Sequence, residues 1–331
     1  MRAVRFDEYG DYDVLRVVEV PTPEPAEGEV LIKMAAAAVN PFDNTCRVGW
    51  VPAVQPGMVQ GNEGAGVVVS DGIDALPPGT RVMMVGTYGY ARAGTWQEYV
   101  TANATEAVRV PDNLTDVEAA AVPVAYIAAQ LALTRGVGLK PGMSLLIPGI
   151  GGSVGNAAVQ LARLHGAGQV ITSAGRTEKA EKARSQGYQN VIDLSQESLS
   201  EGVARLTDGK GVDVALDSVG GPISGEALKA LAPGGTLVQM GYPAGTELTV
   251  NSVTLIWNSL GHTASLRIQG FNIYFQSAEA WALAWQVLLP LLASGQVKPL
   301  LDDHTYPLEQ AAEATRHLIE DRPYGKVVLT M

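Results

Sequence analysis

A glycine-rich turn separates a short apolar run from a helical pattern near the middle of the chain. The run Ser144-Leu145-Leu146-Ile147 leads into the turn at 149–155, and residues 156–162 continue with helix-forming side chains. A buried strand, a tight turn and the first turn of a helix are therefore expected here. Glycine has no Cβ to block the turn or an approaching ligand, and the N–H groups of a helix N-terminus attract anions. The turn predicts a binding site for an anion such as a pyrophosphate.

The spacing of the glycines does not by itself establish a dinucleotide-binding turn. Gly149, Gly152 and Gly155 give the pattern G-x-x-G-x-x-G, which departs from the G-x-G-x-x-G of many dinucleotide-binding turns. A strand-to-helix turn without a ligand stays open as an alternative. A phosphate loop of the nucleoside-triphosphatase type is excluded, because no lysine follows the glycines.

Strand and helix patterns alternate from this turn onward. Apolar or β-branched runs predict strands at 144–147, 169–173, 191–192, 212–216 and 236–240, and helical patterns fill most of the intervals. This alternation predicts an α/β fold with a parallel, doubly wound sheet. Ligands of such sheets bind at the carboxyl ends of the strands.

The end of the second predicted strand indicates which dinucleotide binds. NAD-selective sheets place Asp or Glu there to bind the ribose hydroxyls. Here no carboxylate ends the strand, and Ser173, Arg176 and Lys179 are found instead. A hydroxyl, a guanidinium and an ammonium suit a 2′-phosphate, so we expect NADPH rather than NADH. The alternative is that Arg176 and Lys179 are ordinary solvated charges at the start of a helix.

Length, charge and cysteine content restrict the partners. The 331 residues are enough for two domains. A net charge of −11 disfavours nucleic acid and anionic membranes as partners, and no apolar run reaches the length of a membrane span. The single cysteine, Cys46, excludes an intrachain disulfide, and a cytoplasmic location is expected.

The regions that flank the alternating segment have a different character. Residues 1–122 contain short β-like runs between Pro and Gly turns, which predicts a compact, mostly β domain. Residues 274–331 contain helical patterns at 278–293 and 308–320 and a strand pattern at 326–329, and are expected to return to that domain. The expected dinucleotide-binding domain spans residues 123–273.

An ordered set of motifs runs along the whole chain. They are N-x-x-D-x-x-x-R-x-G at 40–49, G-x-E-x-x-G-V at 61–67, Gly-Thr-Arg-Val at 79–82, Gly-Thr-Trp-Gln-Glu-Tyr at 94–99 and Gly-Lys-Val-Val-Leu at 325–329. With these motifs the chain resembles the medium-chain dehydrogenase/reductase superfamily, and within it the zinc-free quinone oxidoreductase (zeta-crystallin-like) branch. The resemblance implies a mostly β GroES-like catalytic domain interrupted by a doubly wound Rossmann domain.

The metal ligands of the zinc-using relatives are absent from the matching positions. Asn40 and Asn62 stand where those relatives carry Cys and His. The Cys and His residues of the chain, which could serve as zinc ligands, are scattered: Cys46, His165, His262, His304 and His317. A catalytic zinc needs three Cys, His or carboxylate ligands, so no metal is expected.

The resemblance also implies catalytic residues. Asn40 is expected to donate a hydrogen bond beside the nicotinamide, with a turn residue before Pro41 as the alternative. Asp43 either positions the ribose or pairs with Arg47. Tyr126 is a candidate proton donor.

The residues expected at the cofactor lie mainly at strand ends and in the glycine-rich turn. They are Pro41, Gly149, Gly151, Gly152, Ser153, Val154, Gly155, Ser173, Arg176, Lys179, Ser218, Val219, Gly241, Tyr242, Phe271 and Asn272. Trp50 and Tyr90 are expected to wall a pocket for an aromatic acceptor, although an isolated aromatic residue is more often a packing residue.

The leading functional hypothesis is an NADPH-dependent, zinc-independent oxidoreductase that transfers a hydride to a quinone. An NADPH-dependent enone or enoyl (alkenal) reductase is the first alternative. A non-catalytic cofactor-binding partner protein is the second, and a zinc-dependent alcohol dehydrogenase is disfavoured by the missing ligands. The apolar strand pattern at 264–268 is expected to lie at a sheet edge that needs a partner, and the same region pairs across a dimer in relatives. This predicts a homodimer.

Overall fold

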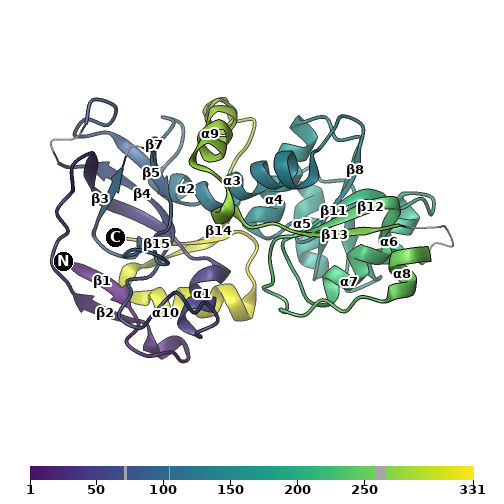
Figure 1. Cartoon of the computed structure of the whole chain (residues 1–331), viewed down its shortest axis with the longest axis horizontal. Coiled ribbons are helices and arrows are strands. Elements are labelled where there is room, and N and C mark those ends of the chain that lie inside the picture. Colours follow the sequence, from purple (N-terminus) through teal and green to yellow (C-terminus); the bar gives the residue numbers. More distant parts are fainter. Residues whose placement is uncertain (71–72, 104, 258–264) are drawn as a thin grey trace. The chain divides into compact units, whose positions relative to one another are not determined.

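The chain divides into two compact units in the computed structural model, which describes residues 1–70, 73–103, 105–257 and 265–331 (Figure 1). Unit 1 comprises Met1–Ala125 and Trp285–Met331, and unit 2 comprises Tyr126–Ala284. Helices α3 (Pro123–Leu131) and α9 (Ala278–Ala293) each run from one unit into the other. His262 and Ala264 lie outside the described residues.

The described residues of unit 2 form a six-stranded sheet in the order β10-β9-β8-β11-β12-β13. Every neighbouring pair of strands is parallel, which confirms the doubly wound sheet expected from the sequence. The strands are β8 (Ser144–Ile147), β9 (Gln169–Ala174), β10 (Val191–Asp193), β11 (Val212–Asp217), β12 (Leu231–Gln239) and β13 (Arg267–Gly270). The helices are α4 (Ser153–Leu164), α5 (Thr177–Ser185), α6 (Leu199–Leu206), α7 (Pro222–Lys229) and α8 (Ser252–Trp257).

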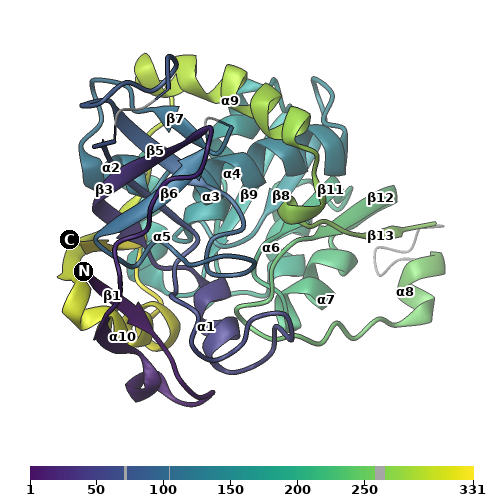
Figure 2. The same ribbon diagram turned by 60° about the vertical axis from the view of Figure 1, so that its left-hand side comes forward.

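The central strands of this sheet are apolar on both faces because helices cover both. Figures 1 and 2 show α4 on one face and α7 on the other. Leu145 and Leu146 of β8 are both fully buried, although neighbouring residues of a strand point to opposite faces. The sheet order runs outward in opposite directions from β8 and from β11, and ligands of such folds bind beyond the carboxyl ends of the strands at this point.

Unit 1 is mostly β. A two-stranded antiparallel sheet joins β1 (Arg2–Arg5) to β2 (Arg16–Glu19). In the part of the chain that the structure describes, the main sheet has seven strands: β3 (Glu29–Ala38), β4 (Glu63–Val68), β5 (Arg81–Val85), β6 (Tyr99–Asn103), β7 (Ala107–Arg109), β14 (Leu301–Pro307) and β15 (Lys326–Thr330). Its helices are α1 (Pro41–Arg47), α2 (Asp116–Ala120) and α10 (Ala311–Arg316).

The last strand of the chain completes the sheet of unit 1. β15 pairs antiparallel with β3, with Leu329 opposite Ala37. The two ends of the chain lie on the same side of unit 1 in both views (Figures 1 and 2). This pairing brings residue 326 beside residues 40–63, and those positions hold a buried polar cluster. Among the described residues, no helix has the length and apolar character needed to span a bilayer.

Candidate cofactor and acceptor site

The glycine-rich turn has the geometry of an anion cradle. It connects the end of β8 at Ile147 to the start of α4 at Ser153. Gly149 has φ +82°, a conformation that disfavours other residues, and a Cβ on Gly155 would lie 2.5 Å from the Gly149 carbonyl oxygen. The first turn of α4 leaves the N–H groups of Ser153, Val154 and Gly155 without intrahelical acceptors. These amides and the helix dipole fit the diphosphate of a dinucleotide.

Ser173 holds this turn in place from β9. Its hydroxyl oxygen accepts a hydrogen bond from the Gly149 N–H at 3.3 Å, and its carbonyl accepts one from Ile150 N–H at 2.9 Å. The side chain is buried. We expect Ser173 to meet a 2′-phosphate, and in the structure its hydroxyl oxygen lies against the glycine turn.

The turn after β11 lies next to the glycine turn. A Cβ on Gly149 would come within 2.9 Å of the Val219 side chain. Asp217, to which the sequence analysis gave no role, shapes this second turn: its carboxylate accepts hydrogen bonds from the N–H groups of Val219 (2.7 Å) and Gly220 (3.1 Å) and from the Ser224 hydroxyl (2.5 Å).

Four predicted cofactor residues follow β12 and β13: Gly241, Tyr242, Phe271 and Asn272. A Cβ on Gly241 would meet the Ser218 carbonyl at 2.4 Å, and Tyr242 is exposed beside Gly220. The Phe271 N–H bonds to the Gln239 carbonyl at 2.8 Å. Asn272 caps the following turn by accepting a hydrogen bond from Tyr274 N–H at 2.8 Å. Because the strands are parallel, all of these residues lie beyond the carboxyl ends of the strands, on the same side of the sheet as the glycine turn.

Arg176 and Lys179 lie at the start of α5, just past the end of β9. Arg176 is the N-cap residue of α5 and is exposed, while Lys179 is half-buried. Ile192 and Asp193 of β10 are the register partners of Ser173 and Ala174. A carboxylate therefore does stand at this corner of the sheet, on the neighbouring strand.

Asn40 of unit 1 is part of a buried polar cluster. Its Nδ2 donates to Asn62 Oδ1 at 2.7 Å and to Glu63 Oε1 at 2.9 Å, and its Oδ1 accepts from the Lys326 ammonium. Both N–H groups of the amide are thus used inside the protein. The donor role predicted for Asn40 requires one of these bonds to be exchanged for a bond to the ligand.

Glu63 connects the same cluster to a helix. Glu63 Oε1 lies 2.5 Å from Lys326 Nζ, and Oε2 accepts a hydrogen bond at 2.6 Å from the N–H of Val124, in the first turn of α3. Sequence reasoning missed both charged residues. Their signal was present, since Lys326 interrupts the apolar closing strand and Glu63 opens the buried strand β4.

Asp43 does not pair with Arg47, contrary to one expectation from the sequence. Its Oδ2 accepts a hydrogen bond from the Asn40 N–H at 2.7 Å. Arg47 instead bonds to the Gly10 carbonyl and stacks on Tyr12, with 3.9 Å from the guanidinium carbon to the ring centroid. Burial raises the pKa of Asp43 to about 7, although the N–H of Asn40 and the charge of Lys326 act to lower it.

Tyr126 lies in the interior of unit 2. Its side chain is 1% exposed, and its hydroxyl accepts a hydrogen bond from Gln160 at 3.2 Å. Burial raises the pKa of Tyr126 well above its ordinary value. These properties make it a poor proton donor in the conformation described.

The two aromatic residues expected to wall the acceptor pocket differ in exposure. Trp50 is 61% exposed. Tyr90 is half-buried and packs edge-on against Phe42, with 6.1 Å between ring centroids. Phe42 follows Pro41 in α1, so Tyr90 lies near the predicted cofactor residue of unit 1, and Trp50 lies just beyond the end of that helix.

The residues at the positions of the zinc ligands do not fit a metal ion. The amides of Asn40 and Asn62 bond to each other, and a lysine ammonium bonds to the Asn40 oxygen that a cation would need. Across residues 1–70, 73–103, 105–257 and 265–331, no group of three or more His, Cys, Asp or Glu side chains is arranged to hold a metal.

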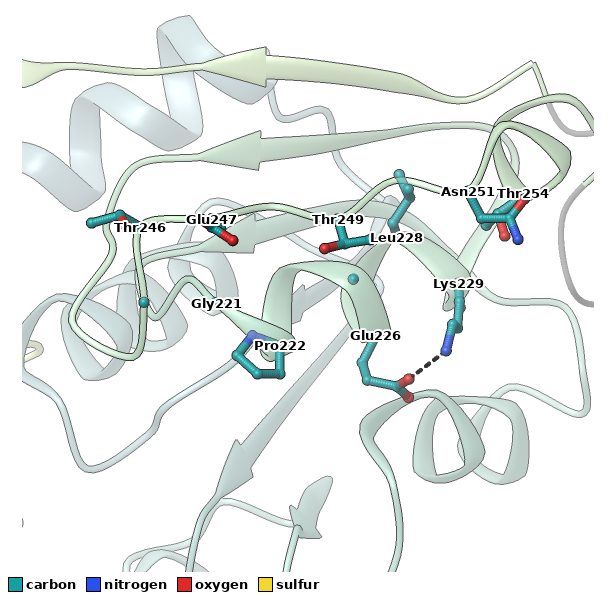
Figure 3. Close-up of a pocket in the computed structure, with 12 residues that line it drawn as sticks. Gly221, Pro222, Glu226, Leu228, Lys229, Thr246, Glu247, Thr249, Asn251 and Thr254 are labelled. Atoms are coloured by element: carbon teal, nitrogen blue, oxygen red, sulfur yellow. Dashed lines mark hydrogen bonds and ion pairs between the residues drawn. The ribbon is translucent and has the colours of Figure 1, made fainter.

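A cavity of about 760 Å³ lies elsewhere in unit 2, between α7 and the segment 245–254 (Figure 3). Glu226 and Lys229 form an ion pair at its wall with 2.7 Å between Oε1 and Nζ, and Glu226 also accepts from the Ser200 hydroxyl at 2.6 Å. None of the residues predicted to contact the cofactor lines it.

Comparisons with known proteins agree with the two units. Residues 26–112 match the family described as "Alcohol dehydrogenase GroES-like domain", and residues 153–289 match the family described as "Zinc-binding dehydrogenase". These matches confirm the expected fold, with a mostly β GroES-like part and a Rossmann-type parallel sheet.

Individual relatives cover the full length of the chain. The human synaptic vesicle membrane protein VAT-1 homolog is 30% identical over 346 residues, which span 99% of this chain and 86% of that protein. A mycobacterial protein complexed with NADPH has a TM-score of 0.88 at 29% identity. Quinone oxidoreductase of Escherichia coli complexed with NADPH has a TM-score of 0.88 at 27% identity. Both structural comparisons cover 100% of both chains.

Proposed function

The chain belongs to the medium-chain dehydrogenase/reductase superfamily, and from this premise we propose that it is an NADPH-dependent oxidoreductase that transfers a hydride to a quinone without a metal. The observation that carries the proposal is the glycine turn between β8 and α4, at the point where the order of the strands reverses between β8 and β11. The N–H groups in the first turn of α4 have no acceptor within the helix. The solved E. coli quinone oxidoreductase with NADPH supports the choice of coenzyme and acceptor.

The chain's own residues bind and orient the coenzyme in this proposal. NADPH, when bound, supplies the hydride. The N–H groups of Ser153, Val154 and Gly155 hold its diphosphate. The exposed guanidinium of Arg176 offers the fork of donors that a 2′-phosphate accepts.

A quinone suits a site whose polar groups do not hold a metal. An ordinary carbonyl needs a Lewis acid or an acid catalyst to accept a hydride readily, whereas a quinone is already electron-poor. The protein then has to hold donor and acceptor face to face and to supply hydrogen bonds. The Asn40 amide is a neutral donor that suits a developing negative charge, and it reaches an acceptor only by exchanging its bond to Asn62 or Glu63 for one to the ligand.

Turnover with two acceptor classes tests the proposal. Initial rates are measured with NADPH and either a para-quinone or an enone of similar size. We expect higher kcat/KM for the quinone. A preference for the enone establishes the alternative reductase, and NADPH binding with no turnover of any acceptor supports a non-catalytic binding protein. Absence of binding for both NADPH and NADH in calorimetry overturns the proposal.

The coenzyme preference has its own test. Arg176→Ala should weaken NADPH binding far more than NADH binding, because only NADPH carries the 2′-phosphate. Equal losses for the two coenzymes would show that Arg176 does not read the phosphate.

We also propose that the protein is a homodimer. All four residues of β13 are exposed, and β13 pairs with β12 on one side only among the described residues. Exposed sheet edges of this kind are normally paired or covered. The neighbouring helix α8 exposes Val253, Ile256 and Trp257, which supports a partner at this edge.

A further inference from the structure

A buried carboxylate accepts hydrogen bonds from two hydroxyl groups at the corner of unit 2 where β9 and β10 end. Asp193 Oδ2 accepts a hydrogen bond from the Thr177 hydroxyl at 2.7 Å. Asp193 Oδ1 accepts from the N–H of Ser195 at 3.0 Å and from its hydroxyl at 2.6 Å. The Thr177 and Ser195 hydroxyl oxygens are 3.0 Å apart. Hydrogen bonds from Ser195 and Thr177 hold the pKa of Asp193 below its ordinary value, so the carboxylate is charged at neutral pH.

This arrangement lies where the proposed function places the 2′-phosphate. Asp193 is the register partner of Ala174, the last residue of β9. Arg176 follows two positions later, and Thr177 is the first residue of α5. A hydroxyl at the N-terminus of a helix is a suitable donor to a phosphate.

The carboxylate works against a phosphate in two ways. Its negative charge repels a second anion at short range. It also accepts the protons of both hydroxyl groups, so that neither Thr177 nor Ser195 can donate to a phosphate without giving up its bond to Asp193. The side chain is only 6% exposed and both oxygens already accept hydrogen bonds, so it is poorly placed to bind a ribose hydroxyl instead.

We propose that Asp193 is a specificity-determining residue. It weakens binding of the 2′-phosphate, so that the preference for NADPH over NADH is smaller than Arg176 alone would give. The inference rests on the proposed function, since it concerns the coenzyme of the same site. A purely structural role, in which Asp193 only orders the start of α5, would affect both coenzymes alike.

Asp193→Asn tests the inference by binding alone. Dissociation constants are measured by calorimetry for NADPH and NADH, and for adenosine 2′,5′-bisphosphate and AMP, which isolate the adenosine end. We expect about tenfold tighter binding of the two 2′-phosphorylated ligands, from the lost repulsion and the released hydroxyl donors. NADH and AMP should change by less than about twofold.

Asp213→Asn is the matched control. Asp213 also accepts hydrogen bonds from a serine N–H (2.7 Å) and hydroxyl (2.8 Å), those of Ser144, but it lies near the start of β11 at the amino end of the parallel sheet. Removing this charge should leave the NADPH-to-NADH affinity ratio unchanged. An equal gain with both variants would assign the effect to net charge and overturn the inference.

A second variant covers the case in which Asp193→Asn does not fold. Ser195→Ala keeps the carboxylate and the backbone N–H bond to it, and removes only the Ser195 hydroxyl that donates to Asp193 Oδ1. The negative charge of Asp193 is then less compensated, so binding of NADPH should weaken several-fold while binding of NADH is unaffected. An unchanged affinity ratio in either folded variant overturns the inference and leaves the proposed function standing. Failure of the unmodified protein to bind either coenzyme overturns both.

Discussion

Lys326 and Glu63 form an ion pair with 2.5 Å between Nζ and Oε1, although they lie 263 positions apart in the chain, and their side chains are only 2% and 0% exposed. The pair joins the last strand of the chain to β4, and Asn40 bonds to both charged groups. A buried charge whose partner is removed is left without compensation and costs far more than an exposed one. The cluster is therefore a point at which single substitutions should be costly.

Lys326→Met should lower the free energy of unfolding by about 3–5 kcal/mol, because it leaves the Glu63 carboxylate buried without its counter-charge. Urea denaturation of purified protein measures the change. The double variant Lys326→Met/Glu63→Gln should recover part of the loss, since no unpaired charge remains. Lys229→Met is the control: it breaks the more exposed pair with Glu226 and should cost less than about 1 kcal/mol. Equal costs for the two single variants would contradict this account.

Asp43 should make unfolding depend on pH. Its pKa is raised from 3.8 to about 7 by burial, so between these values the folded protein holds a proton that the unfolded chain has lost. The free energy of unfolding then falls as the pH rises from about 4 to about 7, by up to about 4 kcal/mol from this residue.

Asp43→Asn should flatten that pH dependence, because an amide does not titrate. Urea denaturation at pH 5, 6, 7 and 8 gives the comparison. The free energy of unfolding should fall more steeply with rising pH in the unmodified protein than in the variant. If both proteins have the same slope, Asp43 does not carry the raised pKa.

The sequence predicted unit 2 well because its signals are local. Strand β8 and helix α4 follow directly from apolar runs, glycines and helical spacing, and helix α9 has the expected bounds of 278–293. Strand β12 begins five residues before the predicted start at Thr236, since Pro233, Gly234 and Gly235 concealed its first half. The predicted helix at 308–320 is instead a 3-10 turn, helix α10 and a π-helical turn.

The candidate site was predicted less completely because its key contacts join distant parts of the chain. The Asn40–Lys326 bond spans 286 positions, and no local pattern indicates it. No carboxylate ends β9, but Asp193 reaches the same corner from β10, 19 positions beyond Ala174 in the chain. Such relationships follow from strand order, which the sequence alone indicates only in outline.

Gly155→Ala should weaken NADPH and NADH alike, by at least about tenfold, because the new Cβ would lie 2.5 Å from the Gly149 carbonyl and displace the turn that binds the shared diphosphate. Fluorescence titration of each coenzyme measures the effect. Gly225→Ala is the matched control: it is also a helical glycine, and its Cβ would meet only the Thr249 carbonyl at an ordinary 3.6 Å. A selective loss of NADPH would place the 2′-phosphate, rather than the diphosphate, at this turn.

Ile268→Lys should separate the proposed dimer into single chains. Ile268 lies in β13, whose outer edge has no partner strand among the described residues, and a charge on an edge strand opposes pairing with another edge. Light scattering at several protein concentrations measures the mass of the particle. The control Leu164→Lys adds the same charge at a residue of similar exposure, 43% against 39%, at the end of α4. Dissociation by both variants would point to charge rather than to this edge, and a single-chain mass for the unmodified protein would contradict the dimer.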